Sequence, residues 1–377
     1  MSAVYSGRQQ RLLAAAREAG LAGLVLYSDA VHSFIELDPV WYATGLRAIG
    51  PSGLVIADGL DPVLFVTPTW DLARATESAA GADIETRAAG DGLLRALAAA
   101  AKDAGLTAAS LGVVGAERLT AVTRAALNDA VGAGWADFDQ PAREVAMVKD
   151  TAEQDLVRRA SWIAEEGYRQ ALADVRPGMK EFEFAGRLDT YMHQLGADDN
   201  FLIVSASRHN RSVHAPSDRI LADGDILLAE ISPSYQGAFA QICRTAVIGE
   251  PSKELADSYE MLRAAFASGL AKCHPGTTMG EIVEAVNEPI EAAGFAEFCR
   301  PPYMRTRGHG MGLGSPYPVS VATTTKVTLA AGMTFVLHPN QYLPTVGYLM
   351  CGDHLLITDD GPEVLSAQWA QLDSVAG

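Results

Sequence analysis

The sequence predicts two domains, an α/β domain over residues 1–145 and a larger α+β domain over residues 146–377. A chain of 377 residues is longer than one typical domain. In its first part, short β-rich runs alternate with Ala-rich helical segments, which is typical of an α/β domain. In its second part, long amphipathic helices are grouped between β-rich runs, which favours helices packed on a curved antiparallel sheet.

The first domain opens with a helix, because Leu12, Leu13 and Ala16 recur at helical spacing and Gly20 suits a helix C-terminus. Short runs of β-branched and apolar residues, separated by Asp, Gly and Pro turns, then predict strands. We expect strands at 23–27, 53–57 and 63–66, and helices near 70–80, 92–104 and 120–132.

The pattern breaks around 139–148, which places the domain boundary near residue 145. A long amphipathic helix follows and ends before Pro177 and Gly178. The β-rich runs at 225–231 and 238–248 are joined through SPSYQG, which predicts a hairpin. In this domain we expect helices at 151–175, 181–195, 254–272 and 279–293, strands at 201–205, 225–231 and 238–248, and a β-rich end after a Gly-rich passage.

Composition limits the partners. The net charge of -17 makes attraction to nucleic acid or to anionic membranes unfavourable. The four cysteines show no CxxC pair, so neither a disulfide framework nor a cysteine zinc site is indicated. No uninterrupted apolar run is long enough to span a bilayer. We expect a cytoplasmic protein that binds a small molecule and has no nucleic-acid or membrane partner.

Four segments of the second domain carry residues suited to catalysis. They are HNRSVHAPSDR with His209 and His214, LLAEISPSYQGAFAQICRTAVIG with Glu230 and Gln241, RTRGHGMGLGSPYP around His309, and MTFVLHPNQYLPTVGYLMCGDHLLIT with His338, Gly352, Asp353 and His354. In order, spacing and flanking residues they resemble the pita-bread family of creatinase, aminopeptidase P and prolidase. The resemblance implies a C-terminal pita-bread domain, a creatinase-type N-terminal domain, and a homodimer whose subunits complete each other's pockets.

In the metal-dependent members of this family, two Asp, one His and two Glu hold two divalent ions. At the matching positions this chain has Glu230, then Gln241 eleven residues later, His309, His338 and Gly352. Two dications only a few ångströms apart repel each other and need several carboxylates to neutralise them. In this chain three of the four carboxylates are replaced, and Glu230 alone remains anionic. A dinuclear site and standard metallopeptidase chemistry are therefore not expected.

Two readings of this set remain open. Glu230, His309 and His338 form a two-His, one-carboxylate group that could hold one divalent transition metal. Alternatively the site uses no metal, as in creatinase. His214 then matches the histidine that serves creatinase as general acid and base, and imidazole exchanges protons near neutral pH.

Substrate-binding residues follow from the same comparison. Arg305 and Arg307 lie just before His309. Together with His338, His354 and His214 they suggest a neutral or positive cavity suited to a carboxylate. Further candidates are Arg47, which stands where creatinase uses an arginine for its substrate's carboxylate, together with Tyr317, Gln241 and Asp353. Creatine itself is not expected, because His338 and Cys243 replace the two glutamates that bind its guanidinium.

The sequence therefore predicts a metal-independent hydrolase that cleaves a C–N bond in a small carboxylate-bearing metabolite. His214 would act as general acid and base, with Glu230, His309 and His338 in the catalytic set. Two alternatives are a mononuclear metalloenzyme built on Glu230, His309 and His338, and a catalytically inactive pita-bread binding module.

Overall fold

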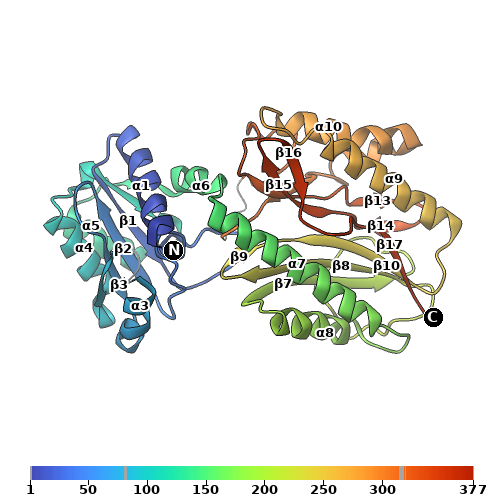
Figure 1. The fold of residues 1–377 in the computed structure, drawn as a ribbon, viewed down its shortest axis with the longest axis horizontal. Helices are drawn as coiled ribbons and strands as arrows, with labels where there is room; N and C mark the ends of the chain where they lie inside the picture. The colour runs from blue at the N-terminus through green and yellow to red at the C-terminus, as the bar shows by residue number, and fades with distance from the viewer. Residues whose placement is uncertain (1, 80–82, 314–317, 319, 377) are drawn as a thin grey trace. The chain divides into compact units, whose positions relative to one another are not determined.

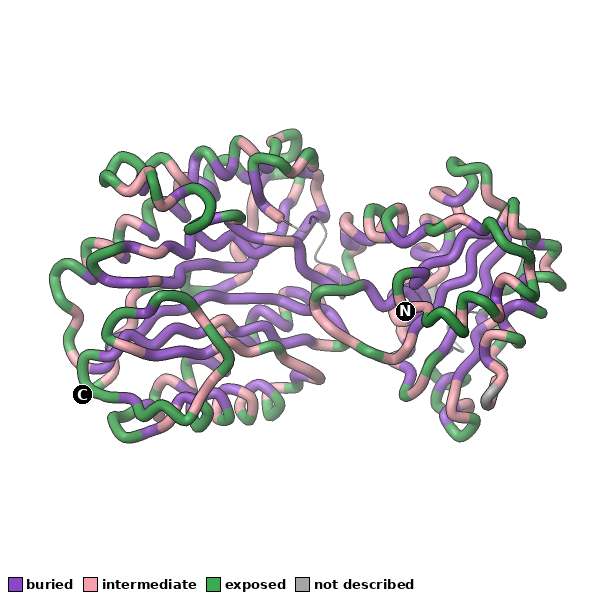
Figure 2. The backbone as a smooth tube through the Cα atoms, turned by 180° about the vertical axis from the view of Figure 1, so that it is seen from behind, coloured by how far each residue is buried: buried purple, intermediate pink, exposed green. Residues whose placement is uncertain are grey.

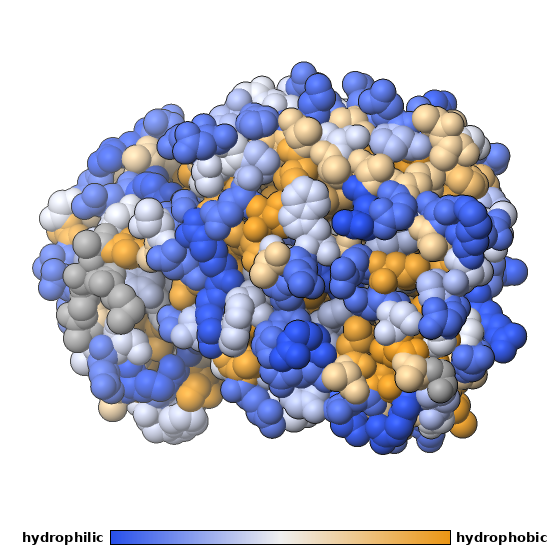
Figure 3. All heavy atoms as spheres, turned by 45° about the vertical axis from the view of Figure 1, so that its right-hand side comes forward, coloured by the Kyte–Doolittle hydropathy of each residue, from blue (hydrophilic) through white to orange (hydrophobic). Residues whose placement is uncertain are grey.

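The chain forms two compact units, Met1–Ala146 and Met147–Gly377, in a computed structural model that describes residues 2–79, 83–313, 318 and 320–376. Figure 1 shows the elements of each unit. The division falls one residue from the boundary expected near 145. Across the face shown in Figure 3, hydrophilic residues surround several small, separate groups of hydrophobic ones.

The N-terminal unit is built on a six-stranded mixed sheet in the order β4-β3-β2-β1-β5-β6. β1 pairs antiparallel with β2 and parallel with β5. The strands are β1 (Gly23–Ser28), β2 (Ser52–Ala57), β3 (Val63–Val66), β4 (Glu85–Ala88), β5 (Leu111–Val114) and β6 (Ala136–Asp137). The helices are α1 (Ser2–Glu18), α2 (Pro39–Thr44), α3 (Leu72–Ala79), α4 (Leu93–Asp103), α5 (Ala121–Val131) and α6 (Asp139–Met147), the last of which crosses the division.

The first half of the C-terminal unit is a sheet in the order β17-β10-β8-β7, with β9 paired to β8. Helices α7 and α8 cover one face of this sheet, and α7 runs across it in Figure 1. The bounds are α7 (Thr151–Ala173), α8 (Glu181–Gln194), β7 (Asp199–Ser207), β8 (Ile226–Tyr235), β9 (Ala238–Phe239), β10 (Ile242–Ile248) and β17 (Leu372–Val375).

The second half is a sheet in the order β11-β12-β15-β16, whose apolar side chains pack with helices α9 and α10. The bounds are α9 (Lys253–Leu270), α10 (Met279–Ile290), β11 (Gly308–Gly310), β12 (Thr334–Leu337), β15 (Asp353–Thr358), β16 (Gly361–Val364) and the hairpin β13 (Gln341–Leu343) and β14 (Gly347–Leu349). A backbone bridge between Cys243 and Gly352 joins the two halves. Figure 2 shows that the strands of this unit are mostly buried.

The observed elements match the expected pita-bread architecture, a mixed set of helices and sheets in both units. All four cysteines are buried and free. In the described part of the chain, no helix is long and apolar enough to cross a membrane.

Candidate active site

Five residues on neighbouring strands form what we call the central row: Glu230, Cys243, Gly352, His338 and His309. Cys243 on β10 lies opposite Glu230 on β8, and it bridges to Gly352 just before β15. The antiparallel register of β12 and β15 places Gly352 opposite His338. The ring of His338 lies 5.8 Å from that of His309 on β11, centroid to centroid. Since directly opposed residues share a face of a sheet, the row lies on one face.

Glu230 is the carboxyl group of this row. The residue is half-buried, but protein atoms surround its carboxyl group closely enough for burial to raise its pKa from 4.5 to about 7. At neutral pH the protonated and ionised forms are therefore both well populated. A carboxyl group in this state can accept a proton in one step and donate it in another.

The histidines of this region are neutral at physiological pH. Burial, reinforced by His309, lowers the pKa of His338 and of His354 to about 3 in each case. Burial also lowers the pKa of His309, although a hydrogen bond with a backbone carbonyl partly offsets it. The backbone N–H of Gln241 donates to Nδ1 of His354 at 3.2 Å. The imidazoles thus supply neutral hydrogen-bonding groups and add no positive charge to this region.

Amide side chains surround the thiol of Cys243. Gln241 Nε2 and Asn340 Nδ2 lie 3.7 Å and 3.6 Å from its Sγ as hydrogen-bond donors. The hydroxyl of Ser232 donates to Oε1 of Gln241 at 3.1 Å. Burial, together with the nearby Glu230 carboxylate, raises the pKa of the Cys243 thiol well above its usual value. The thiol stays protonated, and Gln241 is fixed in a buried amide network.

The residues present do not fit the two-ion centre that the family resemblance implies. Gly352 stands at one ligand position, and a Cβ there would lie 2.5 Å from Cβ of His338 and 2.7 Å from the carbonyl oxygen of Leu337. A carboxylate side chain has no room at this position. Gln241, at another ligand position, is a neutral amide. Among the residues that the structure describes, no group of three or more His, Cys, Asp or Glu side chains is arranged to hold a metal ion.

His214 and Arg305 lie on exposed segments outside the central row. His214 is in the connection between β7 and β8, and its Nδ1 lies 2.7 Å from the carbonyl oxygen of Ala215. Arg305 precedes β11 by three residues. Both side chains are open to solvent and accessible to a ligand.

Arg307 has a different environment from the one expected of a substrate-binding residue. It is only 1% exposed. Its guanidinium donates to Oδ1 of Asn287 at 2.9 Å, to the carbonyl oxygen of Asn340 at 3.1 Å and to Oε1 of Gln341 at 3.0 Å. A further contact reaches Sγ of Cys299 at 3.4 Å. Arg307 therefore connects α10 with β13, which is a structural role.

Asp353 is likewise held by the protein itself and is fully buried. Its Oδ1 accepts from Nη2 of Arg244 and from the hydroxyl of Ser366, each at 2.7 Å. Its Oδ2 accepts from the backbone N–H of Ala370 at 2.8 Å. Because consecutive residues of a strand point to opposite faces, Asp353 points away from the face that carries Gly352.

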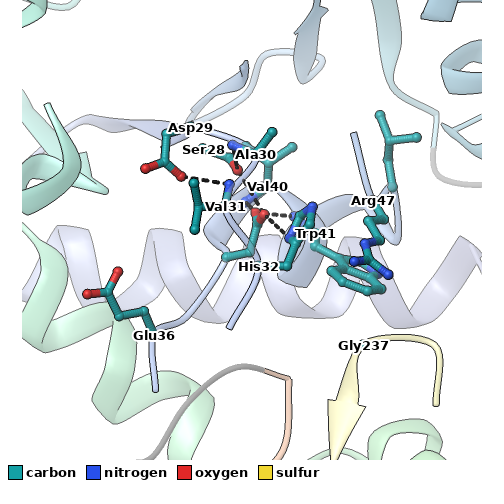
Figure 4. A network of polar contacts seen from close by, with 12 residues as sticks. Ser28, Asp29, Ala30, Val31, His32, Glu36, Val40, Trp41, Arg47 and Gly237 are labelled. Atoms are coloured by element: carbon teal, nitrogen blue, oxygen red, sulfur yellow. Dashed lines mark hydrogen bonds and ion pairs between the residues drawn. The ribbon is translucent and has the colours of Figure 1, made fainter. Parts of the chain in front are cut away.

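Arg47 belongs to the N-terminal unit, where it lies beside Trp41 (Figure 4). Its guanidinium carbon is 5.4 Å from the centroid of the Trp41 ring, a cation–π arrangement. Trp41 is positioned by Asp38, which caps α2 by accepting from the N–H groups of Val40 and Trp41. Tyr317, the other expected residue, lies outside the described residues.

Sequence reasoning left out Tyr348 and Asn340, both of which lie close to the row. Burial, together with the Glu230 carboxylate, raises the pKa of the Tyr348 phenol. Asn340 contacts Cys243, as described above, and its Oδ1 accepts from the N–H of Cys351 at 2.9 Å. Spacing could have pointed to Asn340, since it lies two residues after His338 and such residues share a face of an extended segment.

The sequence between residues 155 and 359, more than half of the chain, matches the model of Metallopeptidase family M24. The chain belongs to this family. Among curated M24 relatives, it is 29% identical to the probable dipeptidase PepE of Mycobacterium bovis over 375 residues, which cover 95% of this chain and 93% of the relative. It is 26% identical to the uncharacterized peptidase YqhT of Bacillus subtilis, where the match covers 59% of this chain and 63% of the relative.

Solved structures similar to this M24 chain cover nearly all of it. The dipeptidase PepE of Mycobacterium ulcerans aligns with a TM-score of 0.82 and 26% identity, over 100% of this chain and 99% of the other. The Xaa-Pro dipeptidase of Bacillus anthracis aligns with a TM-score of 0.83 and 23% identity, over 98% and 100%. The pita-bread fold expected from the sequence is thereby confirmed.

Proposed function

We propose that this M24 chain is a hydrolase of C–N bonds that acts without the two-ion centre of its family, with Glu230 as the general acid and base. One observation carries the proposal: a carboxyl group with a pKa of about 7 stands in a row whose imidazoles are neutral. Enzymes with one carboxyl group of raised pKa use it in this way. The similarity to the probable dipeptidase PepE of Mycobacterium bovis supports a peptidase-like reaction.

The proposed reaction adds water across an amide bond. Ionised Glu230 removes a proton from water as the oxygen attacks the carbonyl carbon, and the C=O electron pair moves to the carbonyl oxygen. A neutral imidazole N–H of His338 stabilises the resulting oxyanion. When the C–N bond breaks, protonated Glu230 returns the proton to the leaving nitrogen, and a carboxylic acid and an amine are formed.

The proposed substrate is a small molecule with a carboxylate beside the scissile bond, such as a dipeptide or an N-acyl amino acid. Arg305 is exposed and accessible to such a carboxylate, and Arg47 is a second candidate. His214, on its exposed segment, is the alternative to Glu230 as general acid and base. We also propose a cytoplasmic homodimer, on the strength of the family resemblance.

The proposal is tested by incubating chelator-treated protein with a panel of substrates and measuring turnover. The panel contains dipeptides, including Xaa-Pro dipeptides, and N-acyl amino acids. We expect activity without added metal, a loss of at least about 100-fold in kcat for Glu230→Gln, and no change for Glu77→Gln, an exposed control. His214→Ala shows whether that residue shares proton transfer. The pH dependence of kcat should follow a group with a pKa of about 7 in wild type.

Two outcomes would overturn the proposal. A bound transition metal that is required for activity, and that elemental analysis finds missing from His338→Ala, would favour a single-ion enzyme built on Glu230, His309 and His338. The unpartnered Nδ1 of His338 is the observation that makes this outcome worth testing. Tight binding of a panel member without turnover would instead favour a catalytically inactive binding module.

A further inference from the structure

A cavity of about 330 Å³ lies in the C-terminal unit between α7, β10 and the segment 367–373. Two buried side chains, Tyr168 of α7 and Arg244 of β10, contribute to its lining. Arg244 follows Cys243 directly in the strand, so its side chain points to the opposite face of the sheet. The cavity is therefore separate from the central row and lies on the helix-covered face of β10.

Two indole rings form the open walls of this cavity. Trp162 comes from α7 and Trp369 from the C-terminal segment, and they are 41% and 42% exposed. Each ring is held in place. Arg159 lies 4.1 Å from the Trp162 ring centroid, and Phe266 meets Trp369 edge-on with centroids 5.5 Å apart. Fixed, half-exposed indoles offer apolar area to a ligand at a small cost in side-chain entropy.

The lining also carries an excess of negative charge. Arg169 pairs with Glu166 of the lining, while Arg244 pairs with a carboxylate outside it. Two further carboxylates of the lining have neutral donors as partners. Glu165 accepts from two backbone N–H groups of the C-terminal segment, each at 2.8 Å. Asp373 accepts from the Tyr168 hydroxyl at 2.8 Å, with a side-chain amide as its other partner.

We propose that this cavity binds a small organic cation with a flat apolar body. The volume suits a molecule of this size, because small-molecule sites begin at roughly 300 Å³. Indole faces attract cations as well as apolar groups. The carboxylates of Glu165 and Asp373, which form no ion pair with a described residue, would balance the positive charge of the ligand. An anion of the same shape would be repelled.

Calorimetric titration of the full-length protein with tryptamine tests this site, with indole-3-acetate as the anionic counterpart of similar shape. We expect saturable binding of tryptamine, and at least tenfold weaker binding of indole-3-acetate. Trp369→Ala and Asp373→Asn should each weaken tryptamine binding about tenfold or more. Asp373→Asn keeps an acceptor for the Tyr168 hydroxyl, so it removes charge with little change in shape.

Trp70→Ala is the matched control, because Trp70 is 68% exposed and belongs to the N-terminal unit. The Trp70→Ala variant should bind tryptamine with the same affinity as wild type. Thermal unfolding of each variant establishes that it is folded. The proposal fails if tryptamine does not saturate the wild-type protein, if indole-3-acetate binds equally well, or if folded Trp369→Ala and Asp373→Asn both bind tryptamine as wild type does. Turnover is not measured, so the result is independent of the proposed hydrolase activity.

Discussion

Glu230 lies in surroundings that favour its protonated form, and this preference links protein stability to pH. Its folded-state pKa of about 7 is above the ordinary value of 4.5. Stabilisation by the neutral form is therefore fully present below pH 4.5 and is lost as the pH rises through about 7. Above that range, the buried carboxylate costs about 3 kcal/mol of folding free energy.

The variant Glu230→Gln should gain stability relative to wild type as the pH increases. Glutamine resembles the neutral carboxylic acid at every pH, so the difference between variant and wild type should grow by up to about 3 kcal/mol between pH 4.5 and pH 8. Urea unfolding at several pH values measures this difference. Glu77→Gln, on an exposed helix face, should show no such trend. A pH-independent difference for Glu230→Gln would contradict a raised pKa.

Gly352 has no space for a side chain, which predicts a cost for even the smallest substitution. The Cβ of Gly352→Ala would lie 2.5 Å from Cβ of His338 and 2.7 Å from the carbonyl oxygen of Leu337. We expect about 1–3 kcal/mol of destabilisation from this overpacking. Gly186→Ala is the control, since it lies inside α8 with no atom within 4 Å of a new Cβ. That change should stabilise the protein by about 0.5–1 kcal/mol. Thermal unfolding of both variants provides the comparison.

The positions of the central row could be predicted from the sequence, but the partners of the charged residues next to it could not. Resemblance placed Glu230, His309 and His338 in one site, and the structure brings them into one row. The alternation of side chains along a strand could have excluded Asp353 from this site, because its neighbour Gly352 belongs to the central row and consecutive residues point to opposite faces. Arg307 offered no such signal, since its partners come from distant segments.

At the scale of elements, Arg244 and Asp353 connect β10 to β15 through a buried ion pair with a distance of 2.7 Å. Burial lowers the pKa of Arg244, but the Asp353 carboxylate more than offsets this effect and the net pKa is raised. Removing one partner leaves the other charge buried. We expect Arg244→Met to cost about 3–5 kcal/mol.

Urea unfolding measures the effect of Arg244→Met, and the double variant Arg244→Met/Asp353→Leu identifies its cause. If the uncompensated charge is responsible, the double variant should recover part of the lost stability. Lys253→Met serves as control, since it breaks an exposed pair with Asp257 and should change stability little. A double variant less stable than Arg244→Met would show that shape, not charge, dominates at this junction.

Most helices and strands could be predicted because each spans enough residues for its hydrophobic pattern to be recognised. The helix expected at 151–175 is α7, and the strand expected at 63–66 is β3. Some short elements have too few residues to show such a pattern and could not be predicted. α2 has six residues and depends on the cap supplied by Asp38. β5 has four residues, LGVV, and is defined by its parallel pairing with the distant strand β1. Such pairing is a property of the fold and leaves little local pattern.

At the scale of the molecule, each unit contains an apolar cluster of its own. Val25, Val55, Leu97 and Val113 belong to a cluster formed entirely within the N-terminal unit, where α4 packs on the sheet of β1, β2 and β5. The clusters around α7 and α8, and around α9 and α10, are formed entirely within the C-terminal unit. A domain with its own core is expected to fold by itself.

We therefore expect the fragment 1–146 to fold as an independent domain. Its size is ordinary for a domain with one hydrophobic core. Circular dichroism should show both helix and strand, and thermal unfolding should give a single cooperative transition. Leu97→Ala removes a side chain that is 1% exposed in this cluster, and it should cost about 2–5 kcal/mol in the fragment and in the whole chain alike. A fragment that melts without cooperativity, while the whole chain unfolds in one sharp step, would mean that the N-terminal sheet depends on the C-terminal unit for its stability.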